Sequence, residues 1–353
     1  MFKKFDLPIA LALIFLTTLS TVVLKSIAPN IFPTYFIYIA LGIVSFIVFS
    51  QIEFDVLSLF SSHFYIVSIV LLVATLIIGG VTRGVIRWIP IGSISIQPSE
   101  IVRPFLLIFF ANFLTAERLD FKRLVHVLLL MALPLFLILV QPSLGVTVLT
   151  SVGFLGIFLA SEIEKKHFLY LLLVSSILIP GIFFILAPYQ KSRISAFLNP
   201  ASDPLGKGYN SIQSQISVGS GKLFGRGLGK GIQTQLAFLP ERHTDFIFAS
   251  ISEEMGFVGA SLVLLGLFVV LFRLAVLTEH SSGSSARAYL SGLFLILFVQ
   301  VGIHIGMNMG LLPITGIPLP LLSAGGSSLL GTMIGLGIAN GTKKRYNIQS
   351  QQT

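Results

Sequence analysis

The segment LPERHTDFIFA, residues 239–249, places a carboxylate where a polar stretch meets a long apolar run. Asp245 is the last charged residue before that run, so it falls at the boundary between water and membrane. An acid at the start of a helix is stabilised by the helix dipole, and Asp245 could therefore simply stabilise a helix N-terminus. It could equally act as a general base. The residues alone leave both interpretations open.

Other charges lie inside apolar runs, where they are costly unless they are paired or face a cavity. In QPSEIVR, Pro98 suits the first turn of a helix and Glu100 lies near its positive end. Arg103 follows three residues later on the same face, so the spacing predicts that Glu100 and Arg103 pair in an outward cavity.

The segment SEEMG places two adjacent acids, Glu253 and Glu254, in the apolar run after Asp245. They point about 100° apart around a helix and cannot face one partner. Either one makes a structural hydrogen bond while the other faces water, or the acids belong to a functional site.

A glycine-rich segment, GSGKLFGRGLGKG at 219–231, superficially resembles a nucleotide phosphate loop. Lys222 is followed by Leu223 rather than Ser or Thr, which argues against that motif. The segment is either a tightly turning loop or a backbone that closes over a diphosphate with its N–H groups.

Two further segments predict how the apolar runs pack. His304 and Asn308 share a helix face, and we interpret them as hydrogen-bonding residues between helices. The stretch 311–328, LLPITGIPLPLLSAGGSS, is broken by proline and glycine at membrane depth, which is typical of backbone that lines a cavity.

The elements that must position these residues are membrane helices. Of 353 residues 54% are hydrophobic and only 10% are charged, whereas a soluble domain has roughly 25% charged residues. The chain has no cysteine, which excludes disulfides and cysteine-based redox or metal chemistry. The net charge of +9 arises in loops between apolar runs, so it suits anionic lipid rather than nucleic acid.

Apolar runs near 20 residues long predict an all-α polytopic membrane protein with about ten transmembrane helices. We expect a single integral membrane domain over 1–353, with one long extracytoplasmic loop, 188–245, between helices 7 and 8. The predicted spans are 8–25, 33–51, 62–80, 98–116, 124–141, 143–161, 167–187, 246–273, 288–310 and 325–341.

Basic residues in the short loops predict that both termini are cytoplasmic. The short outer loops hold only Lys25, Arg83 and Arg87. The predicted inner segments hold twelve basic residues: Lys3, Lys4, Arg118, Lys122, Arg123, Lys165, Lys166, Arg273, Arg287, Lys343, Lys344 and Arg345.

The long outer loop carries a surplus of cations, which indicates an anionic ligand on the outer face. Its acids are Asp203, Glu241 and Asp245. Its basic residues are Lys191, Arg193, Lys207, Lys222, Arg226, Lys230 and Arg242.

Several long segments, in order along the chain, together resemble the SEDS family of bacterial cell-wall glycosyltransferases, its elongation-type members more than its division-type members. They are GVIRWIPIGSISIQPSE, QPSLG, NPASDPLGKGYNSIQSQISVGSGKLFGRG, QTQLAFLPERHTDFIFASISEEMG and LLPITGIPLPLLSAGGSSLL. The resemblance implies a multi-pass protein of the bacterial cytoplasmic membrane that polymerises lipid II during cell elongation. It also implies a partner, a class B penicillin-binding protein, which crosslinks the glycan.

The resemblance also assigns site residues. It implies that Asp245 is the essential carboxylate and that Glu100 and Arg103 are the family's acid and base near the substrate. The family usually has Lys at the latter position, and the planar fork of Arg has a different geometry. Two other positions depart from the family pattern, Ser143 in place of Asp and Ala324 in place of Tyr.

Our mechanistic hypothesis makes Asp245 the general base and outer-face cations the partners of the leaving diphosphate. The candidate cations are Arg193, Lys207, Lys222 and Arg242. A divalent cation, Mg²⁺ or Mn²⁺, could assist, although no cluster of His, Asp and Glu has metal-ligand spacing and the sequence assigns no metal ligands.

Two other functions fit parts of the pattern. A lipid II flippase also needs a cavity and cations, but we would expect its charges near the membrane midplane and often inverted repeats. A non-catalytic scaffold of the wall-synthesis complex leaves the cationic outer loop unexplained. Purified protein that forms glycan from lipid II in detergent would separate the polymerase from both.

Overall fold

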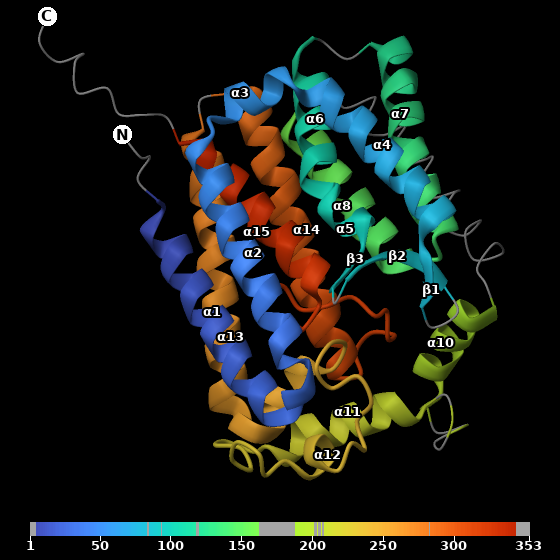
Figure 1. Ribbon diagram of the computed structural model, residues 1–353, viewed down its shortest axis with the longest axis vertical. Coiled ribbons are helices and arrows are strands. Elements are labelled where there is room, and N and C mark those ends of the chain that lie inside the picture. The colour runs from blue at the N-terminus through green and yellow to red at the C-terminus, as the bar shows by residue number, and fades with distance from the viewer. Residues whose placement is uncertain are drawn as a thin grey trace, which may run out of the picture.

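The structure is a computed structural model that describes residues 5–82, 85–92, 94–117, 120–161, 188–200, 203, 206, 208–281 and 283–343. Long helices run side by side along the molecule, and short helices and loops cover the end opposite the chain termini (Figure 1). Most of these long helices coincide with predicted spans, so the all-α polytopic architecture is confirmed. The count of ten stays a prediction, because 167–187 lies outside the described residues.

Six described helices are long and apolar enough to cross a membrane: α1 (Leu7–Ile27), α2 (Phe32–Gln51), α4 (Ser61–Ile78), α7 (Phe121–Val140), α13 (Ile247–His280) and α14 (Ser284–Asn308). Shorter apolar or glycine-rich helices accompany them: α6 (Arg103–Thr115), α8 (Leu144–Ala160) and α15 (Gly326–Gly341). The predicted break at QPSLG is the turn between α7 and α8. Short connecting elements are η1 (Pro29–Ile31), α3 (Phe54–Leu59) and α5 (Pro98–Ile101).

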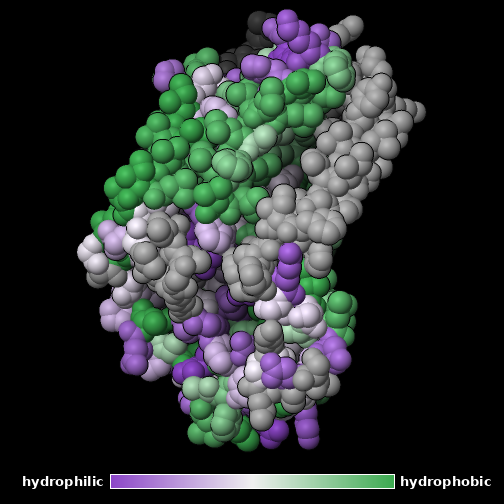
Figure 2. Space-filling view, turned by 90° about the vertical axis from the view of Figure 1, so that its right-hand side faces the viewer, coloured by the Kyte–Doolittle hydropathy of each residue, from purple (hydrophilic) through white to green (hydrophobic). Residues whose placement is uncertain are grey.

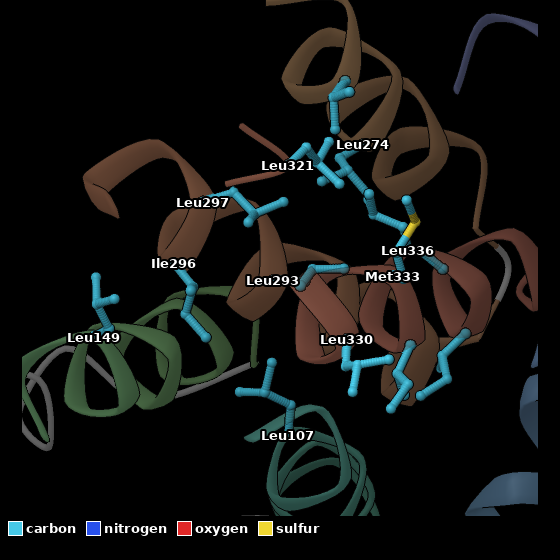
Figure 3. Packing of buried hydrophobic residues seen from close by; sticks show 14 of the residues in the cluster. Leu107, Leu149, Leu274, Leu293, Ile296, Leu297, Leu321, Leu330, Met333 and Leu336 are labelled. Atoms are coloured by element: carbon cyan, nitrogen blue, oxygen red, sulfur yellow. The ribbon is translucent and has the colours of Figure 1, made fainter. Parts of the chain in front are cut away.

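Helix α14 lies at the centre of the bundle and packs against α6, α8, α13 and α15. Leu293, Ile296 and Leu297 of α14 point toward leucines of these neighbours (Figure 3). Every residue of α15 is buried, and its glycines let other backbones approach closely. A Cβ at Gly331 would lie 2.5 Å from the carbonyl oxygen of Glu100, and one at Gly341 would lie 2.4 Å from that of Ile52. Small residues thus set the interhelical spacing here.

A small sheet follows α4 at the outer-loop end of the bundle. Strands β1 (Gly80–Thr82), β2 (Val85–Ile91) and β3 (Ile94–Ile96) pair antiparallel in sequence order. The sequence analysis predicted a short outer loop with Arg83 and Arg87 in this stretch and no strands. The strand pattern is hard to detect because the strands are short and apolar, like the spans beside them.

The long connection 188–245 is more helical than expected. It contains α10 (Pro188–Leu198), α11 (Tyr209–Ser220) and α12 (Ile232–Gln235). The buried face of α11 consists of Ser211, Ser214 and Ser217, so the helix has no apolar periodicity to reveal it. These elements form the hydrophilic end of the molecule, beyond a broad hydrophobic band (Figure 2).

A buried carboxylate joins three helices at the opposite end. Asp6 is fully buried and caps α1 through a 3.2 Å hydrogen bond from the Ile9 amide. Its carboxylate accepts hydrogen bonds from Arg273 of α13 at 2.7 and 3.1 Å, and lies 2.6 Å from the Lys343 ammonium just after α15. Burial by itself raises the pKa of Asp6, but the hydrogen bonds from Arg273 and Lys343 outweigh it and hold the pKa below its ordinary value.

We predict that Asp6→Asn destabilises the purified protein in detergent by about 2–3 kcal/mol, because it leaves two cations without their buried partner. The apparent Tm at pH 7 should fall by about 5 °C or more. The folded pKa of Asp6 is lowered, so its contribution is full above the unfolded pKa near 4 and is lost as the pH falls through the folded value. The Tm difference between the parent and Asp6→Asn should therefore shrink in acid. Glu279→Gln, at an exposed acid of α13, is the control; an equal loss there would contradict the prediction.

Candidate functional site

Asp245 lies in a turn directly before α13, and the start of that helix is held by a residue from another helix. The N-cap residue is Phe246, which makes no side-chain cap. Instead, the Oδ1 atom of Asn308 in α14 accepts a 3.0 Å hydrogen bond from the Ala249 amide. The Nδ2 group of Asn308 donates to the carbonyl oxygen of Asp245, also at 3.0 Å. The residue before the N-cap is therefore positioned by α14 through its backbone carbonyl.

The broken segment that follows α14 packs against the same turn. Ser323 donates a 2.7 Å hydrogen bond to the carbonyl oxygen of Thr244, and the Ala324 amide donates a 2.9 Å bond to that of His243. Because the Ala324 contact is made by the backbone, it does not depend on the side chain at which this sequence departs from the family pattern. His304 is buried and its Nδ1 atom lies 2.8 Å from the carbonyl oxygen of Ile317. Asn308 thus joins α14 to the start of α13 as predicted, whereas His304 bonds to the broken segment rather than to another helix.

Arg193 is the candidate cation that the structure brings close to Asp245. Its Nη1 atom donates a 3.2 Å hydrogen bond to the carbonyl oxygen of Ile314, in the broken segment. Gly316 in that segment has a positive φ of 72° and no side chain. A Cβ built at Gly316 would lie 3.6 Å from both the Arg193 Nη1 atom and the Asp245 Oδ2 atom. The carboxylate of Asp245 and the guanidinium of Arg193 therefore lie on either side of the position that a side chain at Gly316 would occupy.

The other candidate cations do not gather around that position. Arg242 donates a 2.9 Å hydrogen bond to the carbonyl oxygen of Ile27 at the end of α1. Lys222 is exposed, and its carbonyl oxygen accepts a bond from the Phe257 amide, twelve residues beyond Asp245 on α13. Lys207 lies outside the described residues. The structure thus places Arg193 nearest to the acid and Lys222 well away from it.

Glu100 and Arg103 are both buried, each 5% exposed, but the predicted direct pair between them is wrong. They form no ion pair in the described part of the chain, although Arg103 and Arg87 both act electrostatically on Glu100. The helix breaks between α5 and α6 because Pro104 has no N–H to donate to the Glu100 carbonyl. Arg103 instead lines a small internal cavity with Gln300 and Thr332, and its Nη1 atom is buried without a hydrogen-bond partner.

A polar network that the sequence analysis did not identify lies beside Glu100. The Gln97 amide nitrogen in the side chain donates to the Ser99 and Ser143 hydroxyls, each at 3.2 Å. The backbone N–H of Gln97 donates to the Ser327 hydroxyl at 2.7 Å. Ser143, which replaces the family's usual Asp, therefore joins α8 to the residues before α5. The serine and glutamine types at these positions gave no signal, because neither is unusual in a loop.

The glycine-rich segment is inserted into a break in α13. The helix is interrupted at Gly256, whose φ is 66°, so the amides of residues 257 and 258 lose their usual acceptors four residues back. Those two amides donate instead to the carbonyls of Lys222 and Leu223, at 2.8 and 3.1 Å. The carbonyls of Glu253 and Glu254 accept from the amides of residues 226 and 227, at 2.8 and 3.0 Å. Loop backbone thus replaces both missing helical bonds.

Both acids of SEEMG are structural, and neither faces water. Glu253 and Glu254 are each 1% exposed. The carboxylate of Glu253 accepts the backbone amides of Gln233 and Thr234, at 2.8 and 3.0 Å. The carboxylate of Glu254 accepts hydrogen bonds from Ser26, Gln235 and the Gly229 amide. The loop amides that could have cradled a diphosphate are bound to α13 instead, so the interpretation as a tightly turning structural loop holds.

The residues present do not by themselves form a metal centre. Nowhere in the described ranges do three His, Asp or Glu side chains come together as metal ligands.

We predict that Gly225→Ala destabilises the protein by about 2 kcal/mol or more, because φ is 81° there and the new Cβ would lie 2.2 Å from the Glu254 carbonyl oxygen. The matched control is Gly219→Ala, at an exposed position of α11 where a Cβ meets nothing within 4 Å. That change should be neutral or stabilise by up to about 1 kcal/mol. Melting curves of the two variants beside the parent measure the difference. Equal stability of both would show that the loop is not bound into the helix break.

Comparison with known proteins agrees with the resemblance noted from the sequence. The family model described as "Cell cycle protein" (FtsW/RodA/SpoVE) matches residues 1–347. The peptidoglycan glycosyltransferase MrdB of Escherichia coli strain K12 is 40% identical over 304 residues, which cover 85% of this chain and 82% of MrdB. The probable peptidoglycan glycosyltransferase FtsW of Coxiella burnetii is 36% identical over 318 residues, covering 87% and 84%.

Solved structures are similar over nearly the whole chain. One, from a study of the structural coordination of polymerization and crosslinking by a peptidoglycan synthase complex, has a TM-score of 0.82 and 29% identity, covering 95% of this chain and 96% of that one. The rod shape determining protein RodA of Thermus thermophilus has a TM-score of 0.71 and 25% identity, covering 95% of each chain. Family model, relatives and fold agree: the chain belongs to the FtsW/RodA/SpoVE family, the SEDS proteins.

Proposed function

We propose that this chain is a peptidoglycan glycosyltransferase that polymerises lipid II in cell elongation and cell-shape maintenance, with Asp245 as the general base. The activity class is that of relatives up to 40% identical. The observation that supports the site assignment is that the Asp245 carboxylate and the Arg193 guanidinium both lie beside Gly316. A base and a cation beside one position suit a reaction in which an alcohol loses a proton while a diphosphate leaves.

In the proposed reaction, Asp245 takes the proton from the 4-hydroxyl of the acceptor GlcNAc. That oxygen attacks the anomeric carbon of the donor, a C–O bond forms, and the bond from that carbon to the diphosphate oxygen breaks. Undecaprenyl diphosphate leaves with the bonding electrons. Arg193 lies where it can face the negative charge that develops on the diphosphate. General-base catalysis by Asp245 would accelerate the reaction by about 10²–10⁴-fold.

The remaining candidates have different roles in this proposal. Arg242 holds the turn of Asp245 to the end of α1 through its hydrogen bond to Ile27. In this proposal Arg242 therefore positions Asp245 rather than binding the substrate. Glu100 and Arg103 are buried charged residues beneath the outer face of the bundle. In this proposal they shape the electrostatic field at that face. Lys207 and Lys222 are candidates for contacts with parts of the substrate that lie farther from the bond being made.

We propose a class B penicillin-binding protein as the partner that crosslinks the glycan. A similar structure comes from a peptidoglycan synthase complex in which polymerization and crosslinking are coordinated. A glycan strand grows at the outer face, so its crosslinking enzyme needs to reach that same face.

The central prediction concerns Asp245→Asn. Asn keeps the size of Asp but cannot accept the proton, so polymerisation of lipid II by the purified chain with its partner should fall by about 10² or more. Stability should stay near the parent value, because Asn308 still binds the start of α13. Asp245→Glu should recover little, since it shifts the carboxylate by about 1 Å.

The matched control for this test is Glu241→Gln, at an acid of the same turn whose carboxylate accepts a hydrogen bond from Thr244 that Gln can still accept. Its polymer yield should stay within a few-fold of the parent. Near-normal polymer from Asp245→Asn would refute the catalytic assignment, and a loss of Tm with activity retained would return Asp245 to a structural role.

We propose that both termini and the ends of the bundle around Asp120 and His280 face the cytoplasm, while α11 faces outward. The charge bias of the short loops supports this, and the start of α7 and the end of α13 lie at the end of the bundle where the termini lie (Figure 1). We predict that a single cysteine at Asn210 reacts with an impermeant thiol reagent in intact cells, and that cysteines at 120, 165, 280 and 348 react only after lysis. The chain has no native cysteine to interfere. Labelling at 280 before lysis would overturn the orientation.

A further inference from the structure

A second cavity lies at the end of the bundle opposite Asp245. It has a volume of about 890 Å³ and opens between the start of α4, the end of α6 and the start of α7. The start of α7 lies at the end of the bundle where the chain termini lie, away from α11 and α12 (Figure 1). None of the residues assigned to the glycosyltransferase site lines this cavity.

The wall of this cavity combines an apolar part with a charged end, where the carboxylates of Glu117 and Asp120 lie beside the cations. Phe109 and Phe113 of α6 face Val125 and Leu129 of α7. Val125 is 41% exposed and Leu129 is 65% exposed, so the cavity is open to the hydrocarbon at its side. Lys122, Arg123 and His126 line it at the membrane boundary. An opening of this kind in a bilayer is filled by lipid, because neither water nor empty space is stable against apolar walls.

The guanidinium of Arg123 is held in this cavity by two contacts. Its Nη1 atom pairs with Glu117 and its Nη2 atom donates to the carbonyl oxygen of Phe113. The guanidinium lies 5.1 Å from the centre of the Phe113 ring, and His126 stacks near the same ring at 5.9 Å. The Nε group of Arg123 is buried without a hydrogen-bond partner. A buried donor of this kind costs free energy unless an acceptor reaches it.

We propose that this cavity binds a phospholipid of the leaflet on the side of the chain termini. Its phosphate accepts hydrogen bonds from the Arg123 Nε group and Lys122, and an acyl chain lies along Phe109, Phe113 and Leu129. Arg matches phosphate geometry, and basic pockets between transmembrane helices recognise lipid headgroups in this way. Because Arg123 is already held by Glu117 and Phe113, little conformational entropy is lost when the phosphate binds.

The test uses the full chain, purified in detergent and stripped of lipid, with dioleoyl phosphatidylglycerol as the probe. Native mass spectrometry counts bound lipid, and melting curves report stabilisation. We expect one tightly held phospholipid per chain. Diacylglycerol, which lacks the phosphate, and glycerol phosphate, which lacks the chains, should bind at least about 10-fold more weakly, since each loses one half of the contacts.

Arg123→Gln should weaken phosphatidylglycerol binding by about 10-fold or more, the size expected for one charge-assisted hydrogen bond. Arg287→Gln, which removes an exposed arginine at the same end but outside the cavity, should leave binding unchanged. Ala116→Trp keeps every charge and fills the cavity, so it should abolish the tight binding even if Arg123→Gln proves unstable. Equal lipid retention by the parent and Ala116→Trp, or equal binding of diacylglycerol, would overturn the proposal. Equal binding of glycerol phosphate would assign the site to a soluble anion and overturn it as well.

Discussion

The position of Asp245, the proposed general base, depends on how the first turns of α13 are held at the membrane boundary. A helix that starts there has amides without intrahelical acceptors, in a place where water cannot reach all of them. Asn308 supplies an acceptor from a neighbouring helix and also binds the Asp245 carbonyl. The acid is therefore placed relative to α14 rather than by its own helix, and α14 is the centre of the bundle.

The same half of α13 is fixed from the other side by the outer loop. The break at Gly256 would leave two amides and two carbonyls without partners, and the glycine-rich loop satisfies all four. The carboxylates of Glu253 and Glu254 then bind more loop donors. The segment is rich in glycine and cations, a composition typical of mobile loops. Its hydrogen bonds to α13 make it part of the support of the site. This follows from the need to satisfy buried backbone groups.

Much of this architecture could be predicted from the sequence. Long apolar runs identified the spans, and Asp245, Arg193 and the broken segment after α14 do meet at the outer end. Other features could not be predicted, for identifiable reasons. Ser211, Ser214 and Ser217 bury a polar face, so α11 has no apolar period. Glu100 and Arg103 are three residues apart, but the guanidinium of Arg103 lines an internal cavity with Gln300 and Thr332, which the spacing does not reveal. The insertion of the loop at Gly256 depends on contacts between segments some thirty residues apart, which local patterns do not contain.

Charged and polar contacts join α1 to α13 near both ends. At one end Asp6 binds Arg273, and at the other Ser26 donates to Glu254. Separating these two helices would break a contact to a buried carboxylate near each end of α1, so this seam is costly to open. We therefore expect a substrate with a long lipid tail to enter sideways between other helices, with the α1–α13 pair as a fixed wall. A disulfide engineered between α1 and α13 in this cysteine-free chain would therefore leave the entry of lipid-linked sugars unchanged.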